Sequence, residues 1–138
     1  MSKWGLVALL GLQAHFAASY LVPLDQPSQR EFGGLLRWAW PWADGDGGPL
    51  GQVTVAAGFP LPGFFLAVTA TTMFVLAALA VVGLWVPSGW WRGLAAAGAV
   101  LLLCLMTLFF GSTKLIPMGF AVLTLYLALG NSSAFATD

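Results

Sequence analysis

The chain has 138 residues, of which 59% are hydrophobic and only 7% are charged, with a formal net charge of zero. Water-soluble domains carry roughly 25% charged residues. Five basic and five acidic side chains are too few to cover a soluble surface, and the mean hydropathy is +0.89. The composition therefore indicates an integral membrane protein and gives no sign of a nucleic-acid partner.

A helix needs roughly 20 apolar residues to cross the hydrocarbon of a bilayer. The sequence predicts four such spans, over about residues 4–22, 61–86, 90–110 and 113–130. Very short links join the last three, so these form antiparallel hairpins. We therefore predict an all-α membrane protein, a single integral membrane domain over residues 1–138 with its four transmembrane helices in an antiparallel bundle. An alternative with three spans and a re-entrant fourth segment stays open, because that segment is short and contains Pro117.

The loop over residues 23–60 is the least lipid-like part of the chain. Ser28 and Glu31 have the spacing of a capping box, which predicts a short helix after them. The tryptophans that follow indicate that this helix lies at the membrane interface, either as a packed lid or as a lid that faces a substrate or partner. The expected interfacial anchors are Trp38, Trp40, Trp42, Trp90, Trp91 and Lys114.

The charges determine the orientation only weakly. Lys3, Arg92 and the α-amino group lie on the side of the termini, and Arg30, Arg37 and Lys114 lie on the side of the loop. The positive-inside comparison is a tie. We expect cytoplasmic termini in a plasma membrane of bacterial type, because a single exported loop is the commoner arrangement. The first segment also has features of a secretory signal, and we expect it to remain as a span or signal anchor.

Gln13 and His15 stand inside the apolar run of the first span. At about 100° per residue they point about 200° apart, to nearly opposite sides of the helix. An unsatisfied polar group facing lipid costs several kcal/mol. The first span is therefore expected to contact protein on both sides, through another subunit or through the loop.

Three interpretations of His15 compete. The first is a neutral imidazole that bonds to a helix carbonyl, to Ser19 or to a threonine of the second span. The second is an axial ligand of a haem or chlorophyll, for which Gly11 and Ala14 leave room. The third is a proton-relay or substrate-binding residue, which would be expected to have an acidic neighbour. We expect no bound cofactor, with a tetrapyrrole at His15 as the alternative.

Small and polar residues in the spans are the candidates for contacts between helices or with a partner, since small side chains let helix backbones approach closely. These candidates are Gly11, Gln13, His15, Ser19, Thr69, Thr72, Gly93 and Ala97. The threonine hydroxyls can bond to carbonyls of their own helix, so we expect these residues to pack in the core. Cys104 is the only cysteine and is expected to act as a small hydrophobic residue.

The spans contain no aspartate or glutamate, no CxxC, no HExxH and no Ser/His/Asp set. This disfavours a proton-coupled carrier, a thiol oxidoreductase and a hydrolase, so we expect no catalytic residue and no metal site. The favoured function is a non-catalytic accessory or scaffold subunit of a larger membrane assembly. The alternative is a small homo-oligomeric transporter or channel with its pathway between protomers. The expected partners are membrane lipid and other membrane subunits or copies of the chain.

Overall fold

The computed structural model describes residues 1–21, 61–110 and 114–130. These ranges form the α-helices α1 (Lys3–Ala18), α5 (Leu61–Val82), α6 (Trp91–Leu108) and α7 (Leu115–Leu129), and the 3-10 turns η1 (Ser19–Leu21) and η3 (Ser88–Trp90). No β-strand occurs in the described ranges, which confirms the prediction of a helical protein there. The helix predicted in the long loop, with Trp38, Trp40 and Trp42, lies outside the described residues.

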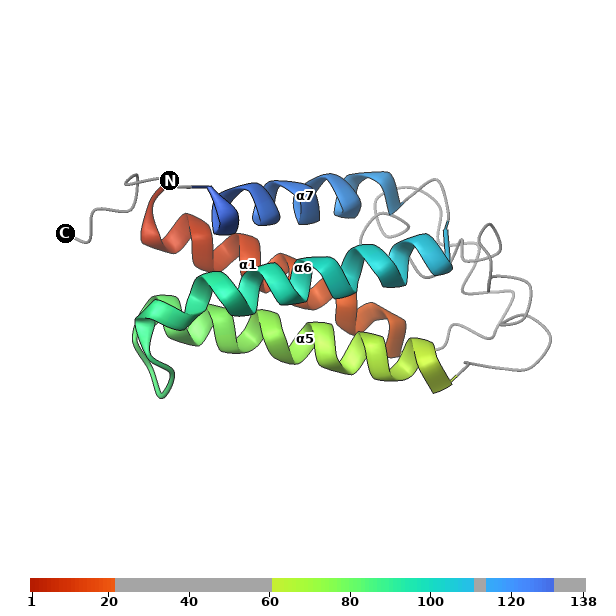
Figure 1. Ribbon diagram of the computed structural model, residues 1–138, viewed down its shortest axis with the longest axis horizontal. Coiled ribbons are helices and arrows are strands. Elements are labelled where there is room, and N and C mark those ends of the chain that lie inside the picture. Colours follow the sequence, from red (N-terminus) through yellow and green to blue (C-terminus); the bar gives the residue numbers. More distant parts are fainter. Residues whose placement is uncertain (22–60, 111–113, 131–138) are drawn as a thin grey trace.

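The helices lie alongside one another, and successive helices run in opposite directions (Figure 1). α1 packs on α5, α5 on α6 and α6 on α7, while a smaller contact joins α7 to α1. The start of α1, the end of α5 and the start of α6 therefore share one end of the bundle. The end of α1, the start of α5 and the start of α7 share the other (Figure 1).

Local hydrogen bonds define where α1 begins and where α5 ends. Ser2 caps α1, since its Oγ accepts a bond of 3.1 Å from the backbone N–H of Gly5. α5 ends at Val82 and not at the predicted residue 86, because Gly83 adopts a left-handed conformation with φ 84°. The N–H of Leu84 then donates to Leu79 O at 2.9 Å, which completes a glycine-terminated helix cap.

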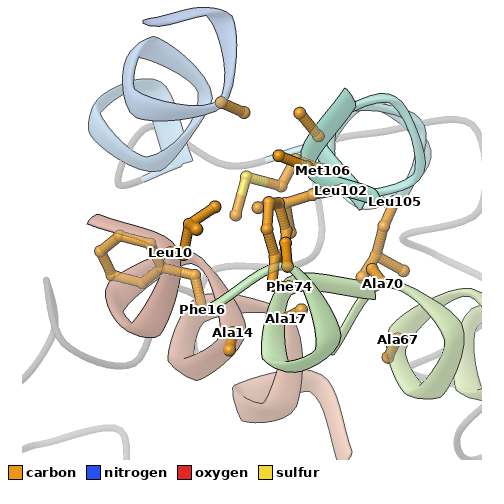
Figure 2. Packing of buried hydrophobic residues seen from close by; sticks show 14 of the residues in the cluster. Leu10, Ala14, Phe16, Ala17, Ala67, Ala70, Phe74, Leu102, Leu105 and Met106 are labelled. Carbon is orange, nitrogen blue, oxygen red and sulfur yellow. The ribbon is translucent and has the colours of Figure 1, made fainter. Parts of the chain in front are cut away.

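Small side chains fill much of the contact surface between the helices. α5 buries Ala67, Ala70, Ala77 and Ala80 around one large residue, Phe74. Leu10, Phe74, Leu102 and Met106 meet between α1, α5 and α6 (Figure 2). Other large apolar residues lie on the outside, among them Phe64, Phe65, Val75, Val122 and Leu123. Small residues at the contacts between helices and large apolar residues on the outside are found in helices that pack within a bilayer.

Length separates α7 from the other helices. Within the described ranges, three helical segments are long and apolar enough to cross a membrane, namely Lys3–Leu21, Gly63–Val82 and Ser88–Leu108. α7 has 15 residues and a length of about 22 Å, against a hydrocarbon thickness of about 30 Å. It is one continuous helix, with Pro117 in its first turn, where the absence of a backbone N–H removes no helical hydrogen bond.

Candidate functional site

Gln13 lies on the inner face of α1 and is completely buried. Its Nε2 donates to Thr124 Oγ1 of α7 over a long distance of 3.4 Å, and the threonine hydroxyl donates to Phe120 O at 2.9 Å. The Gln13 Oε1 has no hydrogen-bond partner among the described residues. Gln13 is thus a polar link between α1 and α7, and one of its two polar atoms is left unsatisfied there.

His15 lies on the opposite, outward face of α1, where it is exposed together with Ala8, Gly11 and Leu12. These four residues form what we call the outer α1 face. A side chain added at Gly11 would meet nothing within 4 Å, so the surface beside His15 is open. The separation of Gln13 and His15 onto opposite sides agrees with the prediction from helical geometry.

Ser19 does not extend the outer α1 face, although it stands four residues after His15. α1 passes into the turn η1 at this point, and Ser19 is buried. Its Oγ donates to Phe16 O at 2.7 Å, within the same segment. The hydroxyl is thereby satisfied locally and does not bond to another helix.

Thr69 and Thr72 are exposed on the outward side of α5. Their hydroxyls donate to Phe65 O at 2.7 Å and to Val68 O at 2.8 Å, four residues earlier in the same helix. Thr107 of α6 does the same with Leu103 O. Threonines satisfied in this way need no partner helix, and they present methyl groups to their surroundings.

The contact between α5 and α6 uses small residues other than Gly93 and Ala97, whose role in a contact with a partner stays a prediction. Gly93 and Ala97 are exposed, and a Cβ at Gly93 would meet nothing within 4 Å. The buried small residues of α6 are instead Ala95, Gly98 and Ala99. A Cβ on Gly98 would lie 3.2 Å from the ring of Phe74, so glycine allows this aromatic ring to pack against the α6 backbone. Ala95 and Ala99 have the same spacing of four residues as Gly93 and Ala97, but they lie on another face of α6.

Lys114 lies at the other end of the bundle and does not extend outward as an interfacial anchor would. Its side chain is completely buried, with Nζ 5.3 Å from the centroid of the Tyr20 ring. The Tyr20 and Phe109 rings lie 6.3 Å apart. Burial against an aromatic ring offers the ammonium a favourable cation–π contact in place of headgroup solvation. Sequence reasoning missed this cluster, because it joins η1 to residues far along the chain.

The remaining anchors lie at the end that holds the chain's start. Trp90 is exposed, while Trp91 is half-buried and has Arg92 Cζ 5.7 Å from its ring centroid. Both residues stand where η3 leads into α6. Trp90 presents its indole outward at this end, and the Arg92 guanidinium lies beside the half-buried Trp91, so their role as interfacial anchors stays a prediction.

The described residues offer little chemistry. Among them no group of three or more His, Cys, Asp or Glu side chains comes together as a metal site would require. Residues 1–21, 61–110 and 114–130 contain no aspartate or glutamate, and Cys104 is exposed. His15 is the one imidazole of the chain and the side chain that would serve a tetrapyrrole as an axial ligand.

Comparison with protein-family models, curated proteins and solved structures finds no match.

Proposed function

We propose that the chain is an integral membrane protein in which α1, α5, α6 and α7 each cross the bilayer, with both termini in the cytoplasm. The exposed large apolar residues of all four helices support this proposal, because such a surface on a soluble monomer would promote aggregation. α7 is short for a span, and local bilayer thinning or a flanking lysine accommodates such a mismatch.

Cysteine labelling tests the number of spans. In a Cys104→Ser background, Ser88→Cys reports on the link between α5 and α6, and Ser112→Cys reports on the link before α7. Four spans place the two links on opposite faces of the membrane, so an impermeant thiol reagent should label one from outside and the other only after lysis. Labelling of both from the same face would contradict the four-span arrangement.

Within that membrane protein, we propose the function of a non-catalytic accessory or scaffold subunit of a larger assembly. The observation that carries this proposal is the outer α1 face, where His15 stands next to Gly11 and Ala8 in the central part of a membrane-length helix. Small residues allow a second helix to approach closely, and an imidazole can bond to it. The face suits a partner helix better than it suits lipid.

The interior of the bundle argues against a transport pathway within one chain. Gln13, Ser19, Lys114 and Thr124 are the buried polar residues of the described segments. Leu10, Phe74, Leu102 and Met106 occupy the space between the helices (Figure 2). A continuous polar path is absent from the described residues, so a transporter or channel would need a pathway between protomers.

Photo-crosslinking tests the partner face. A photoreactive phenylalanine analogue at Leu12 lies on the outer α1 face, and the same analogue at Val100 lies on the outward side of α6, where both native residues are exposed. In native membranes we expect Leu12 to form an adduct with a foreign subunit and Val100 to form none.

The size of the adduct separates the candidate functions. An adduct of twice the chain's mass at Leu12, with no other protein in native mass spectra, favours the homo-oligomeric transporter or channel. Equal crosslinking at Leu12 and Val100, or none at either position, would overturn the proposal that the outer α1 face binds a partner.

A further inference from the structure

We propose that one end of the bundle binds the headgroups of anionic phospholipids. This headgroup end consists of residues 1–4 and 83–92, namely the start of α1, the turn after α5, and η3 with the first residues of α6. The proposal rests on the membrane placement proposed above, but it is independent of any partner at the outer α1 face.

The turn of the headgroup end holds a tryptophan in a strained conformation. The backbone N–H of Val86 donates to Leu84 O at 2.6 Å, which closes a γ-turn with Trp85 at its centre. Trp85 has φ 60°, the one positive φ among the described residues other than glycine. Such γ-turns are rare and strained, and a positive φ is unusual for a bulky side chain. The strain is not offset by packing, because Trp85 is 95% exposed.

Other apolar side chains of the headgroup end also point outward. Trp4 is 69% exposed, Trp90 is 65% exposed and Leu84 is 51% exposed. Indoles concentrate at the level of lipid headgroups, where the ring contacts acyl chains and the N–H remains hydrated. Trp4, Trp85 and Trp90 are thus exposed at the same end of the bundle, as indoles at the level of lipid headgroups would be. Burial in lipid would also repay the strain at Trp85.

The charge at this end is positive. Lys3 Nζ donates to Val82 O at 3.3 Å, so its ammonium lies at the carboxyl end of α5, between the first helix and the turn. Arg92 stands over the Trp91 ring and adds a second cation. The described residues of this end contain no acidic side chain. Cations beside exposed indoles suit a phosphate headgroup with a net negative charge better than a zwitterionic one.

The opposite end of the bundle lacks this combination in its described residues. There Lys114 is buried beside Tyr20 and does not present its charge at the surface. The two ends therefore differ in what they offer a membrane surface. Among the described residues, the headgroup end is the one that carries cations and exposed indoles together.

Fluorescence quenching by brominated lipids tests the proposal. The purified chain is reconstituted in phosphatidylcholine vesicles that contain the same small fraction of either brominated phosphatidylglycerol or brominated phosphatidylcholine. We expect stronger quenching of tryptophan by the anionic lipid. Each accessible basic residue near the surface favours an anionic lipid by about fivefold, and salt should weaken this preference.

Two sets of variants locate the preference. Lys3→Gln with Arg92→Gln removes two charges while keeping hydrogen-bond donors, and it should abolish most of the preference. Trp85→Gly should reduce the preference without loss of folding, because glycine adopts φ 60° without strain. Thr107→Gln, on an exposed site of α6 near the opposite end, is the control and should leave the preference unchanged.

Three results would overturn the proposal. Equal quenching by the two brominated lipids would show an inserted protein that does not select anionic headgroups. A preference for the anionic lipid that does not depend on salt would also overturn the proposal, and this result needs only the wild-type protein, even if the charge variants fail to fold. Absence of quenching by either lipid would overturn the membrane placement as well.

Discussion

The two sides of α1 carry one polar side chain each and differ in what surrounds it. On the inner side Gln13 is buried and reaches Thr124 of α7. On the outer side His15 is exposed beside Gly11, with open space next to it. The inner polar group is thus buried and bonded to another helix, whereas the outer one lies on the exposed face of α1. Burial, and not hydropathy, therefore separates the inner side of α1 from the outer side.

The same contrast extends to the other helices, and substitutions at matched inner and outer sites should reveal it. The largest difference is expected at phenylalanine. Phe74→Ala removes the ring that fills the centre of the bundle and should lower the free energy of unfolding by about 3 kcal/mol. Phe65→Ala, on the exposed side of the same helix, should change it by less than about 0.5 kcal/mol. Unfolding in mixed micelles with increasing dodecyl sulfate, followed by circular dichroism, measures both. Equal losses would mean that α5 buries a different face.

A smaller difference is expected at glycine in α6. Gly98→Leu forces a side chain into the ring of Phe74, from which a Cβ would already lie only 3.2 Å away. Overpacking of this kind should cost about 2 kcal/mol. Gly93→Leu introduces the same side chain on the exposed face of α6 and should leave the stability unchanged or slightly higher. The same unfolding assay checks both variants, and a destabilised Gly93→Leu beside a stable Gly98→Leu would reverse the assignment of the two faces.

Much of the fold follows from local signals that the sequence carries. Runs of apolar residues predicted α1, α5, α6 and α7, and short links predicted the antiparallel order. The end of α5 was predicted four residues too late, because Leu84, Trp85 and Val86 are as apolar as the helix before them. The left-handed conformation of Gly83 ends the helix there, and an isolated glycine in an apolar run is not enough to predict such a cap.

The contacts between helices were harder to predict, because several faces of each helix are equally apolar. In α6 both Gly93 with Ala97 and Ala95 with Ala99 have the spacing of a close helix contact, and the structure buries the second pair. The burial of Lys114 against Tyr20 depends on residues 94 positions apart in the sequence. Helical geometry did predict the opposite directions of Gln13 and His15, since both stand in the same regular helix.

Substitutions of His15 test the role of the outer side of α1. His15→Leu should leave the unfolding free energy of the isolated chain unchanged, because the ring lies outside the bundle. It should weaken association with a partner by about 1 kcal/mol, or about fivefold in the dissociation constant, the scale of polar contacts between membrane helices. His15→Asn keeps a hydrogen-bonding group and should lose less. Binding of the purified partner, or the monomer–oligomer equilibrium if the partner is a second copy, measures the change.

The same variants decide the tetrapyrrole interpretation of His15. We expect a colourless protein, whose absorbance spectrum has neither a Soret nor a chlorophyll band. If the purified protein is coloured, His15→Leu and His15→Asn should both remove the band, because both remove the imidazole ligand. A band that survives both substitutions would exclude His15 as the ligand.

The smallest effect is expected at Gln13, although it is the most deeply buried polar residue of α1. Its hydrogen bond to Thr124 is long, and its Oε1 has no partner among the described residues. The free energy that the amide loses on leaving water is therefore nearly as large as the free energy that it gains from its one hydrogen bond. Gln13→Leu has a similar volume and leaves Thr124 bonded to Phe120 O at 2.9 Å. The substitution should therefore change the free energy of unfolding by only a few tenths of a kcal/mol, with either sign, since replacing a poorly satisfied polar group by an apolar one is often neutral.

Gln13→Leu combined with Thr124→Val, compared with each single variant, measures the coupling between the two residues, which averages about 0.6 kcal/mol for polar pairs in membrane helices. A loss of 2 kcal/mol or more in the single variant would show that the Gln13 carbonyl is bonded in the folded protein, to a buried water or to a residue outside the described segments.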